Sequence, residues 1–83
     1  MYYVYILYSK NKDRLYKGST SDLRERFRQH SKGEVNSTKT GIPWVILYYE
    51  AFVNKTDALR EEKFLKSGRG RERLKYLLKE TLK

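Results

Sequence analysis

The stretch from Tyr2 to Tyr8 constrains the fold more than any other part of the chain. It consists of aromatic, β-branched and aliphatic residues, and apolar side chains occupy both sets of alternating positions. Because successive side chains of a strand point to opposite faces, this pattern is typical of a strand that is covered on both sides. We therefore expect a central strand with other elements packed against each of its faces.

The length and composition predict one small domain. The chain has 83 residues, and we take 1–83 as a single domain. It contains no Cys, which excludes disulfides, thiolate zinc sites and Cys nucleophiles. No apolar stretch approaches the roughly 20 residues of a membrane-spanning helix, and the opening residues lack the features of a signal peptide. We expect a cytoplasmic protein that does not associate with a membrane.

A hairpin should follow the first strand. The polar residues 9–13 predict a turn, and residues 14–18 are expected to return as a second strand. If Lys10 and Asn11 form a two-residue loop, Tyr5 lies opposite Tyr16. Both tyrosine rings then lie on one face of the sheet.

The remaining elements alternate between helix and strand. Asp22, with Glu25 three residues on, resembles a capping box that opens a helix ending near residues 32–33. A polar loop over 34–42 leads to Pro43 and a strand over 44–53. Asn54 or Thr56 should cap a second helix that ends at residue 66 or 67. Gly68 and Gly70 should then interrupt the helical structure. Residues 71–83 should form an amphipathic helix.

This order, ββαβαα, predicts the fold class. We expect an α/β (α+β) domain in which helices flank a small three-stranded antiparallel sheet.

The net charge points to an acidic partner. Nineteen Lys and Arg against ten Asp and Glu give +9 at pH 7, and such a field attracts phosphate backbones. The simpler interpretation is a solvated basic surface. If the partner is a nucleic acid, we expect the contacts to come from Lys17, Arg24, Lys63, Lys66, Arg69, Arg71, Arg73 and Lys75.

Two polar residues of the first predicted helix, Arg26 and His30, are expected to point toward the sheet. Leu23, Phe27 and His30 line the inner face of this helix, and Arg26 lies next to this stripe, one turn before His30. By default, His30 would bond a nearby backbone group and Arg26 would lie at the surface.

Glu62 is expected on the inner face of the second helix. Ala58, Leu59 and Leu65 define the buried stripe, and Glu62 lies within it, whereas Glu61 falls at its edge and should be solvated. Because an unpaired buried carboxylate costs several kcal/mol, Glu62 should have a partner: a metal ion, a basic side chain or a water-filled cleft. The structural alternative is an ion pair with Lys66.

Other reaction classes leave no signature in this chain. It has neither a Cys nor a G-x-S-x-G motif, and it has no P-loop and no Rossmann glycine pattern. The remaining polar groups are an inward carboxylate, inward Tyr and His side chains, and many Arg and Lys. Metal-assisted phosphoryl transfer uses such groups, although each of the tyrosines alone is more typical of a strand core.

Tyr3-Val4-Tyr5 is followed by Tyr16-Lys17-Gly18, with Tyr16 eleven positions after Tyr5. This pair resembles the two tripeptides that name the GIY-YIG nuclease superfamily. The stretch from Gly18 to Arg26 with His30 resembles its first-helix signature, and Ala58 to Lys66 resembles its acidic helix. The resemblance covers about residues 2–75 and is closest to the small single-domain proteins related to the excision-repair nuclease subunit.

The resemblance implies a GIY-YIG-like fold and an endonuclease that hydrolyses DNA with one divalent metal ion, Mg²⁺ or Mn²⁺, in repair or recombination. It implies that Tyr5, Tyr16, Arg26, His30 and Glu62 are catalytic, that Glu62 holds the metal, and that Gly18 allows close packing. Tyr16 is the first choice for activating water. Tyr3 and Lys17 depart from the family tripeptides without removing a proposed catalytic group.

Two alternatives remain open. One is a DNA- or RNA-binding module without catalysis, and the other is a nuclease that acts only with a protein partner. The catalytic interpretation expects all five side chains in one concave site. If Glu62 lay on the opposite side of the sheet from Tyr16, the catalytic interpretation would fail and Glu62 would be a structural ion pair.

Overall fold

The sheet has three antiparallel strands with the first strand in the middle. In this computed structural model, which describes residues 1–83, the strands are β1 (Tyr2–Ser9), β2 (Arg14–Thr20) and β3 (Trp44–Phe52), in the order β2-β1-β3. The predicted central position of the first strand is confirmed.

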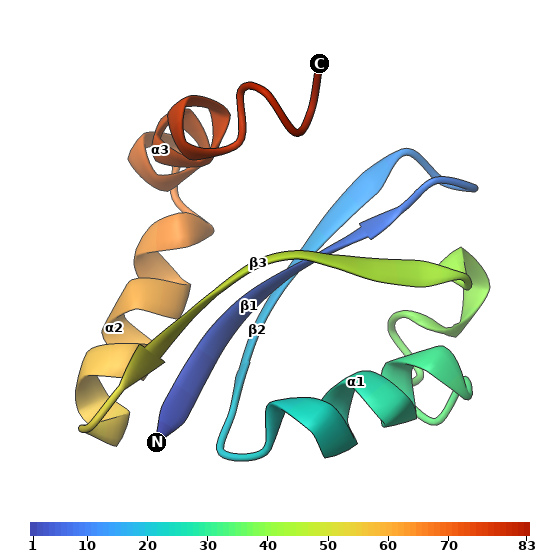
Figure 1. Cartoon of the computed structure of the whole chain (residues 1–83), viewed down its shortest axis with the longest axis horizontal. Helices are drawn as coiled ribbons and strands as arrows, with labels where there is room; N and C mark the ends of the chain where they lie inside the picture. Colours follow the sequence, from blue (N-terminus) through green and yellow to red (C-terminus); the bar gives the residue numbers. More distant parts are fainter.

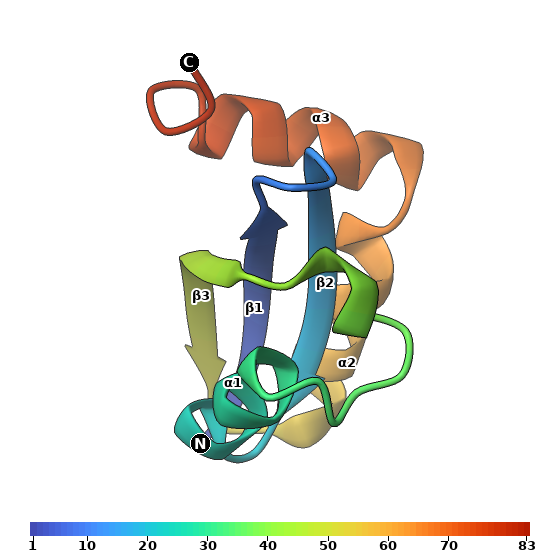
Figure 2. The same cartoon turned by 90° about the vertical axis from the view of Figure 1, so that its right-hand side faces the viewer.

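Helices cover both faces of this sheet. α1 (Leu23–Ser31) lies on one face, and α2 (Lys55–Leu65) with α3 (Gly68–Leu77) lies on the other (Figures 1 and 2). A short 3₁₀ helix, η1 (Lys39–Gly41), lies in the loop between α1 and β3. The order ββαβαα and the α+β class are as predicted. None of the helices is both long and apolar enough to cross a membrane.

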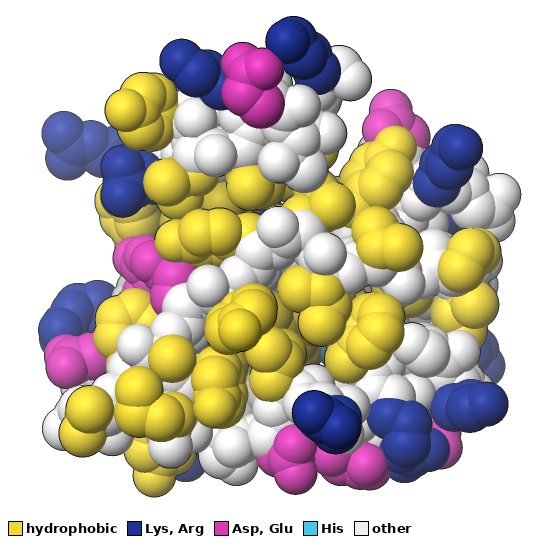
Figure 3. Space-filling model, in the orientation of Figure 1, with side chains coloured by type: hydrophobic (Ala, Val, Ile, Leu, Met, Phe, Trp, Pro, Cys, Tyr) yellow, Lys and Arg dark blue, Asp and Glu magenta, His cyan; other side chains and the backbone are white.

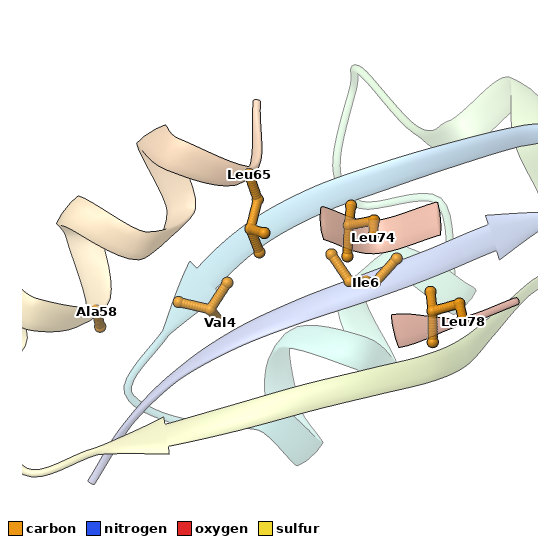
Figure 4. Packing of buried hydrophobic residues seen from close by; sticks show 6 residues of the cluster. All are labelled: Val4, Ile6, Ala58, Leu65, Leu74 and Leu78. Atoms are coloured by element: carbon orange, nitrogen blue, oxygen red, sulfur yellow. The ribbon is translucent and has the colours of Figure 1, made fainter. Parts of the chain in front are cut away.

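β1 supplies side chains to two separate cores. Val4 and Ile6 pack with residues of α2 and α3 in the cluster drawn in Figure 4, which contains Val4, Ile6, Ala58, Leu65, Leu74 and Leu78. Tyr5 and Leu7 point to the other face and pack with Trp44 and residues of α1. Burial of one large aliphatic side chain stabilises a fold by about 1.5–3 kcal/mol, so both faces hold β1 in place.

The polar ends of the helices are capped largely as predicted. The Asp22 side chain accepts a hydrogen bond from the backbone N–H of Glu25, and Asn54 accepts one from Thr56. These bonds satisfy N–H groups that the first turn of a helix leaves free. They fix the start of α1 directly after β2, and the start of α2 directly after β3.

The predicted register of the hairpin was wrong. The pairing ends at Ser9 and Arg14, so residues 10–13 form the loop, and Tyr5 lies opposite Gly18 while Tyr16 lies opposite Leu7. The loop is longer than predicted because Asp13 takes a left-handed backbone conformation and bonds the hydroxyl of Tyr8. The register moves by two residues, so Tyr5 and Tyr16 remain on one face, as expected.

The helical boundaries also need correction. α3 begins at Gly68, with the Ser67 side chain as its N-cap, and ends at Leu77, so 71–83 is not one helix. Leu59 is exposed rather than part of the buried stripe of α2. Glu61 is half-buried, and its charge acts on Glu50 of β3, so it is not an ordinary solvated residue.

Candidate active site

Three rings gather on the α1 face of the sheet. Tyr5 comes from β1, Tyr16 from β2 and His30 from α1, and their ring centroids lie 5.0–6.4 Å apart. Trp44 of β3 lies 6.3 Å from Tyr16 at the edge of this group. Aromatic rings at these distances stabilise one another. Tyr5 and His30 are buried, and Tyr16 is half-buried.

His30 connects Tyr5 to the loop before β3. Its Nε2 lies 2.9 Å from the Tyr5 hydroxyl, and its Nδ1 lies 2.8 Å from Thr38 Oγ1. Burial, together with the positive charge of Arg26, lowers the pKa of His30 to about 4. The imidazole is therefore neutral at pH 7, and one of its nitrogens is free to accept a hydrogen bond. His30 bonds two side chains rather than the backbone group expected by default.

Gly18 makes room for the Tyr5 hydroxyl. A Cβ atom on Gly18 would lie 2.5 Å from the Tyr5 oxygen and 3.1 Å from the Tyr16 ring. No side chain larger than hydrogen fits there without displacing both rings. The implied close packing beside Gly18 is confirmed, and it brings the Tyr5 oxygen to the edge strand β2.

Arg26 lies close to the Tyr5 hydroxyl and to the His30 imidazole. Its guanidinium donates a 2.8 Å hydrogen bond to Gln29, and the side chain is half-buried. Burial raises the pKa of Tyr5, and the Arg26 guanidinium opposes this effect. Arg26 is thus not a solvated surface residue, and its charge acts on the phenol and the imidazole together.

Glu62 is held by two partners. Its Oε1 accepts a 2.6 Å hydrogen bond from Ser19 of β2, and its Oε2 lies 2.8 Å from the ammonium of Lys66. The Glu62 side chain is 19% exposed and that of Lys66 is 54% exposed. The ion pair that the sequence offered as an alternative is present.

Glu62 and Tyr16 come from opposite sides of the sheet, so the five side chains do not share one face. The structure thus meets the condition under which Glu62 was expected to be a structural ion pair. However, β2 is an edge strand, and Ser19, which holds Glu62, directly follows Gly18, which faces Tyr5. The negative charge of Glu62 also raises the pKa of Tyr5, after the larger effect of burial. At the open edge of β2, Glu62 therefore approaches the group that Tyr5, Tyr16 and His30 form on the other face of the sheet.

The residues around Glu62 fit a metal ion only together with a substrate phosphate. No three side chains of His, Cys, Asp or Glu lie together in the structure. Mg²⁺ is commonly held by one or two carboxylates, water and substrate phosphates, so a single carboxylate suffices in that setting. The exposed Lys66 ammonium is the cation that Glu62 binds in this structure.

Part of the predicted nucleic-acid footprint gathers at the same edge. Lys17 is half-buried, and burial together with the charges of Arg71 and Lys66 lowers its pKa. Lys17, Lys66 and Arg71 therefore form a cationic group beside Glu62. Arg73, in contrast, acts on Glu50 and Tyr48 at the β3 side, and Lys75 pairs with Glu72. The remaining basic residues of the prediction, Arg24, Lys63 and Arg69, are exposed.

Sequence reasoning missed several neighbours of the site. Ser19 was not predicted as a site residue, although its alternation with Gly18 places it on the α2 face. Thr38 lies in a polar loop, where no periodicity marks an inward side chain. A cavity beside Tyr16 is lined by two further basic residues, Lys12 and Arg14, and by Thr38 and Trp44.

The chain is similar to known proteins over most of its length. Residues 1–75 match the model of the GIY-YIG catalytic domain. A UPF0213 protein from Pediococcus acidilactici is 36% identical over 80 residues, which cover 92% of this chain and 80% of the relative. A UPF0213 protein from Oceanobacillus iheyensis is 35% identical, with 92% and 88% covered.

A solved structure shares the fold. The solution NMR structure of a UPF0213 protein from Bacillus halodurans has a TM-score of 0.57 and 34% identity, and it covers 93% of this chain and 85% of the other. The family match spans β1, β2, α1 and α2, which carry all five proposed catalytic residues. The chain therefore belongs to the GIY-YIG family of nuclease domains.

Proposed function

We propose that this protein is a divalent-metal-dependent endonuclease that hydrolyses DNA phosphodiester bonds at the open edge of β2. One observation carries the proposal. The Tyr5 oxygen lies over Gly18, where the charges of Arg26 and Glu62 act on it from opposite faces of the sheet. A phosphate that approaches this edge strand can contact groups from both sides, because nothing pairs with the outer edge of β2.

In this mechanism, Arg26 stabilises the negative charge that develops on the phosphate oxygens. Glu62 would hold Mg²⁺ or Mn²⁺, which when bound would supply positive charge to neutralise the phosphate and the leaving group. Lys66 moves from Glu62 to the DNA backbone as the phosphate binds.

The hydrogen bonds favour Tyr5 over Tyr16 as the group that receives the proton of water. Tyr5 has a neutral imidazole within 2.9 Å, whereas no hydrogen bond links the Tyr16 hydroxyl to another side chain. As water attacks phosphorus, its proton passes to the Tyr5 oxygen and the proton of Tyr5 passes to His30 Nε2. The new P–O bond forms while the leaving oxygen departs with its electron pair. Tyr16 then packs the site and orients the substrate.

The direct test is cleavage of single-stranded, duplex, flap and branched DNA with Mg²⁺, Mn²⁺ or EDTA. We expect cleavage of at least one substrate shape that requires the metal. Arg26→Ala should lose most of the rate and a smaller part of the affinity. Activity that appears only with an added protein would identify a partner-dependent nuclease. Binding without cleavage on every substrate would favour the non-catalytic binding module, and a role in repair or recombination would then lose its basis.

A further inference from the structure

His30 can carry its ring proton on either nitrogen, and the choice decides what Tyr5 can do. We propose that Thr38 is a positioning residue that holds His30 in the Nδ1–H tautomer. Nε2 is then free to accept the proton of the Tyr5 hydroxyl. The consequence for catalysis rests on the proposed nuclease function, whereas the tautomer itself is a property of the protein alone.

The proposal follows from counting protons and acceptors. Thr38 Oγ1 lies 2.8 Å from His30 Nδ1 and 3.3 Å from the carbonyl oxygen of Val35. If Nδ1 carries the proton, it donates to Thr38, and the Thr38 hydroxyl donates to Val35. Tyr5 donates to Nε2 over 2.9 Å. Every proton in this chain of hydrogen bonds then has an acceptor.

The opposite tautomer leaves one proton without a partner. Thr38 would have to donate to Nδ1, and Nε2–H would donate to the Tyr5 oxygen. The hydroxyl proton of Tyr5 would then need another acceptor. Tyr5 is only 1% exposed, and the other polar group beside its oxygen, the Arg26 guanidinium, can only donate. A buried donor without an acceptor is costly, so the Nδ1–H tautomer is favoured.

The loop between α1 and β3 holds Thr38 in position. Trp44 Nε1 donates a 2.8 Å hydrogen bond to the Thr38 carbonyl, which also accepts a 3.0 Å bond from the backbone N–H of Gly41. The N–H of Thr38 donates to Val35, and the residue is 1% exposed. The hydroxyl therefore has little freedom to leave His30. The polar loop thus has a role in the site, because it fixes the side chain that bonds His30.

NMR of the imidazole nitrogens tests the tautomer directly. His30 is the only His, so the ¹⁵N spectrum of its ring has one set of signals and needs no assignment by mutation. We expect a protonated Nδ1 and an unprotonated Nε2 at pH 7, in the absence of DNA and metal. A protonated Nε2 in the wild-type protein would overturn the proposal, and this measurement needs no variant to fold.

Two substitutions separate positioning from packing. Thr38→Val keeps the size of the side chain but removes the hydroxyl, whereas Thr38→Ser keeps the hydroxyl. Thr38→Val should weaken the tautomer preference, and Thr38→Ser should restore it. An unchanged tautomer in folded Thr38→Val would show that Thr38 does not set it.

Cleavage kinetics test the consequence for Tyr5. Thr38→Val should lower the single-turnover rate on the order of tenfold, shift the pH profile, and leave DNA affinity nearly unchanged, because Thr38 acts only through His30. Thr38→Ser should recover most of the rate. A wild-type rate in Thr38→Val with an altered tautomer would overturn the positioning role. If the wild type cleaves no substrate, the proposed function fails, and the NMR result still decides the tautomer.

Discussion

At the scale of single residues, Gly18 is the point where the two halves of the proposed site meet. Tyr5 and Tyr16 occupy the space above it, and its neighbour Ser19 holds Glu62 on the other face of the sheet. Successive strand residues are about 3.3 Å apart along the chain, so the two faces are separated by little more than the backbone. The absence of a side chain at Gly18 thus lets the buried Tyr5 hydroxyl lie directly over the backbone of the edge strand β2.

Replacing Gly18 tests this geometry. Gly18→Ala should displace both tyrosine rings, lower the cleavage rate by roughly tenfold or more and reduce stability by about 1–3 kcal/mol, with little effect on DNA affinity. Gly68→Ala is the matched control, because a Cβ atom there meets no atom within 4 Å. Cleavage kinetics, DNA binding and urea unfolding check both variants. Equal rates for Gly18→Ala and the control would contradict the proposed role of Tyr5.

The titration of His30 provides a second test at this scale. Its pKa is lowered to about 4, below the value near 6.5 of an unfolded chain, so the unfolded state binds more protons between these values. The contribution of His30 to stability is therefore complete above about pH 6.5 and is lost as the pH falls through 4. We expect its ring signals to titrate below pH 5 in the folded protein. A midpoint between 6 and 7 would mean that the imidazole is neither buried nor influenced by Arg26.

At the scale of elements, α2 directs two adjacent glutamates to opposite edges of the sheet. Glu62 reaches Ser19 of β2, whereas Glu61 faces Glu50 of β3. Burial and the Glu61 carboxylate raise the pKa of Glu50 to about 7, and Tyr48 and Arg73 lie near enough to oppose the shift. One oxygen of Glu50 is buried without a hydrogen-bond partner. The Glu62 carboxylate of α2 is thus fully hydrogen-bonded, whereas Glu61 faces a carboxylate of β3 that is not.

The proximity of Glu50 and Glu61 should make the stability of the protein depend on pH. Because the pKa of Glu50 is higher in the folded state than in the unfolded state, its contribution to stability is present below pH 4.5 and is lost as the pH rises through about 7. Glu50→Gln should therefore stabilise the protein at pH 8, by on the order of 1 kcal/mol, and much less at pH 5. Urea unfolding at both pH values measures this difference, with Glu72→Gln as an exposed control. A gain that is equal at both pH values would show that the pKa of Glu50 is not raised by burial and by Glu61.

Sequence periodicity predicted the elements but not the contacts between them. The apolar pattern of Tyr2 to Tyr8 and the caps Asp22 and Asn54 depend on local chemistry, and these predictions are confirmed. The hairpin register depended on the backbone conformation of Asp13, which the sequence does not specify. The wheel geometry of α2 placed Glu62 inward, yet it could not show which face of the sheet α2 covers. Thr38 was missed because a loop has no period from which an inward side chain can be recognised.

At the scale of the whole molecule, basic and apolar residues occupy different parts of the surface. Figure 3 shows hydrophobic side chains gathered over β3, with basic side chains around the margin of this face. Val45, Ile46 and Tyr49 of β3 are exposed. Lys17, Lys66 and Arg71 lie at the opposite edge of the sheet, beside Glu62. The β2 edge is therefore the side that we expect to contact nucleic acid.

The salt dependence of binding should reflect this division. For ~4–6 neutralised phosphates, the slope of log K against log salt should be about −4 to −5. Arg71→Ala should reduce the slope by about 1, whereas Arg60→Ala should not, because Arg60 pairs with Asp57 and lies at the β3 side. Fluorescence anisotropy with a labelled oligonucleotide over a range of salt concentrations measures these slopes. Binding that stays constant with salt would remove the electrostatic basis for a nucleic-acid partner.

The most direct test of the central claim is single-turnover cleavage by Glu62→Gln, measured with equilibrium binding on the same oligonucleotide. Glutamine keeps the size of the side chain but removes the charge that would hold the metal ion. We expect cleavage to be abolished while binding is retained or becomes slightly tighter, since a negative charge near the phosphate is lost. Circular dichroism confirms that the variant is folded. Normal cleavage by folded Glu62→Gln would contradict the account and leave Glu62 as a structural partner of Ser19 and Lys66.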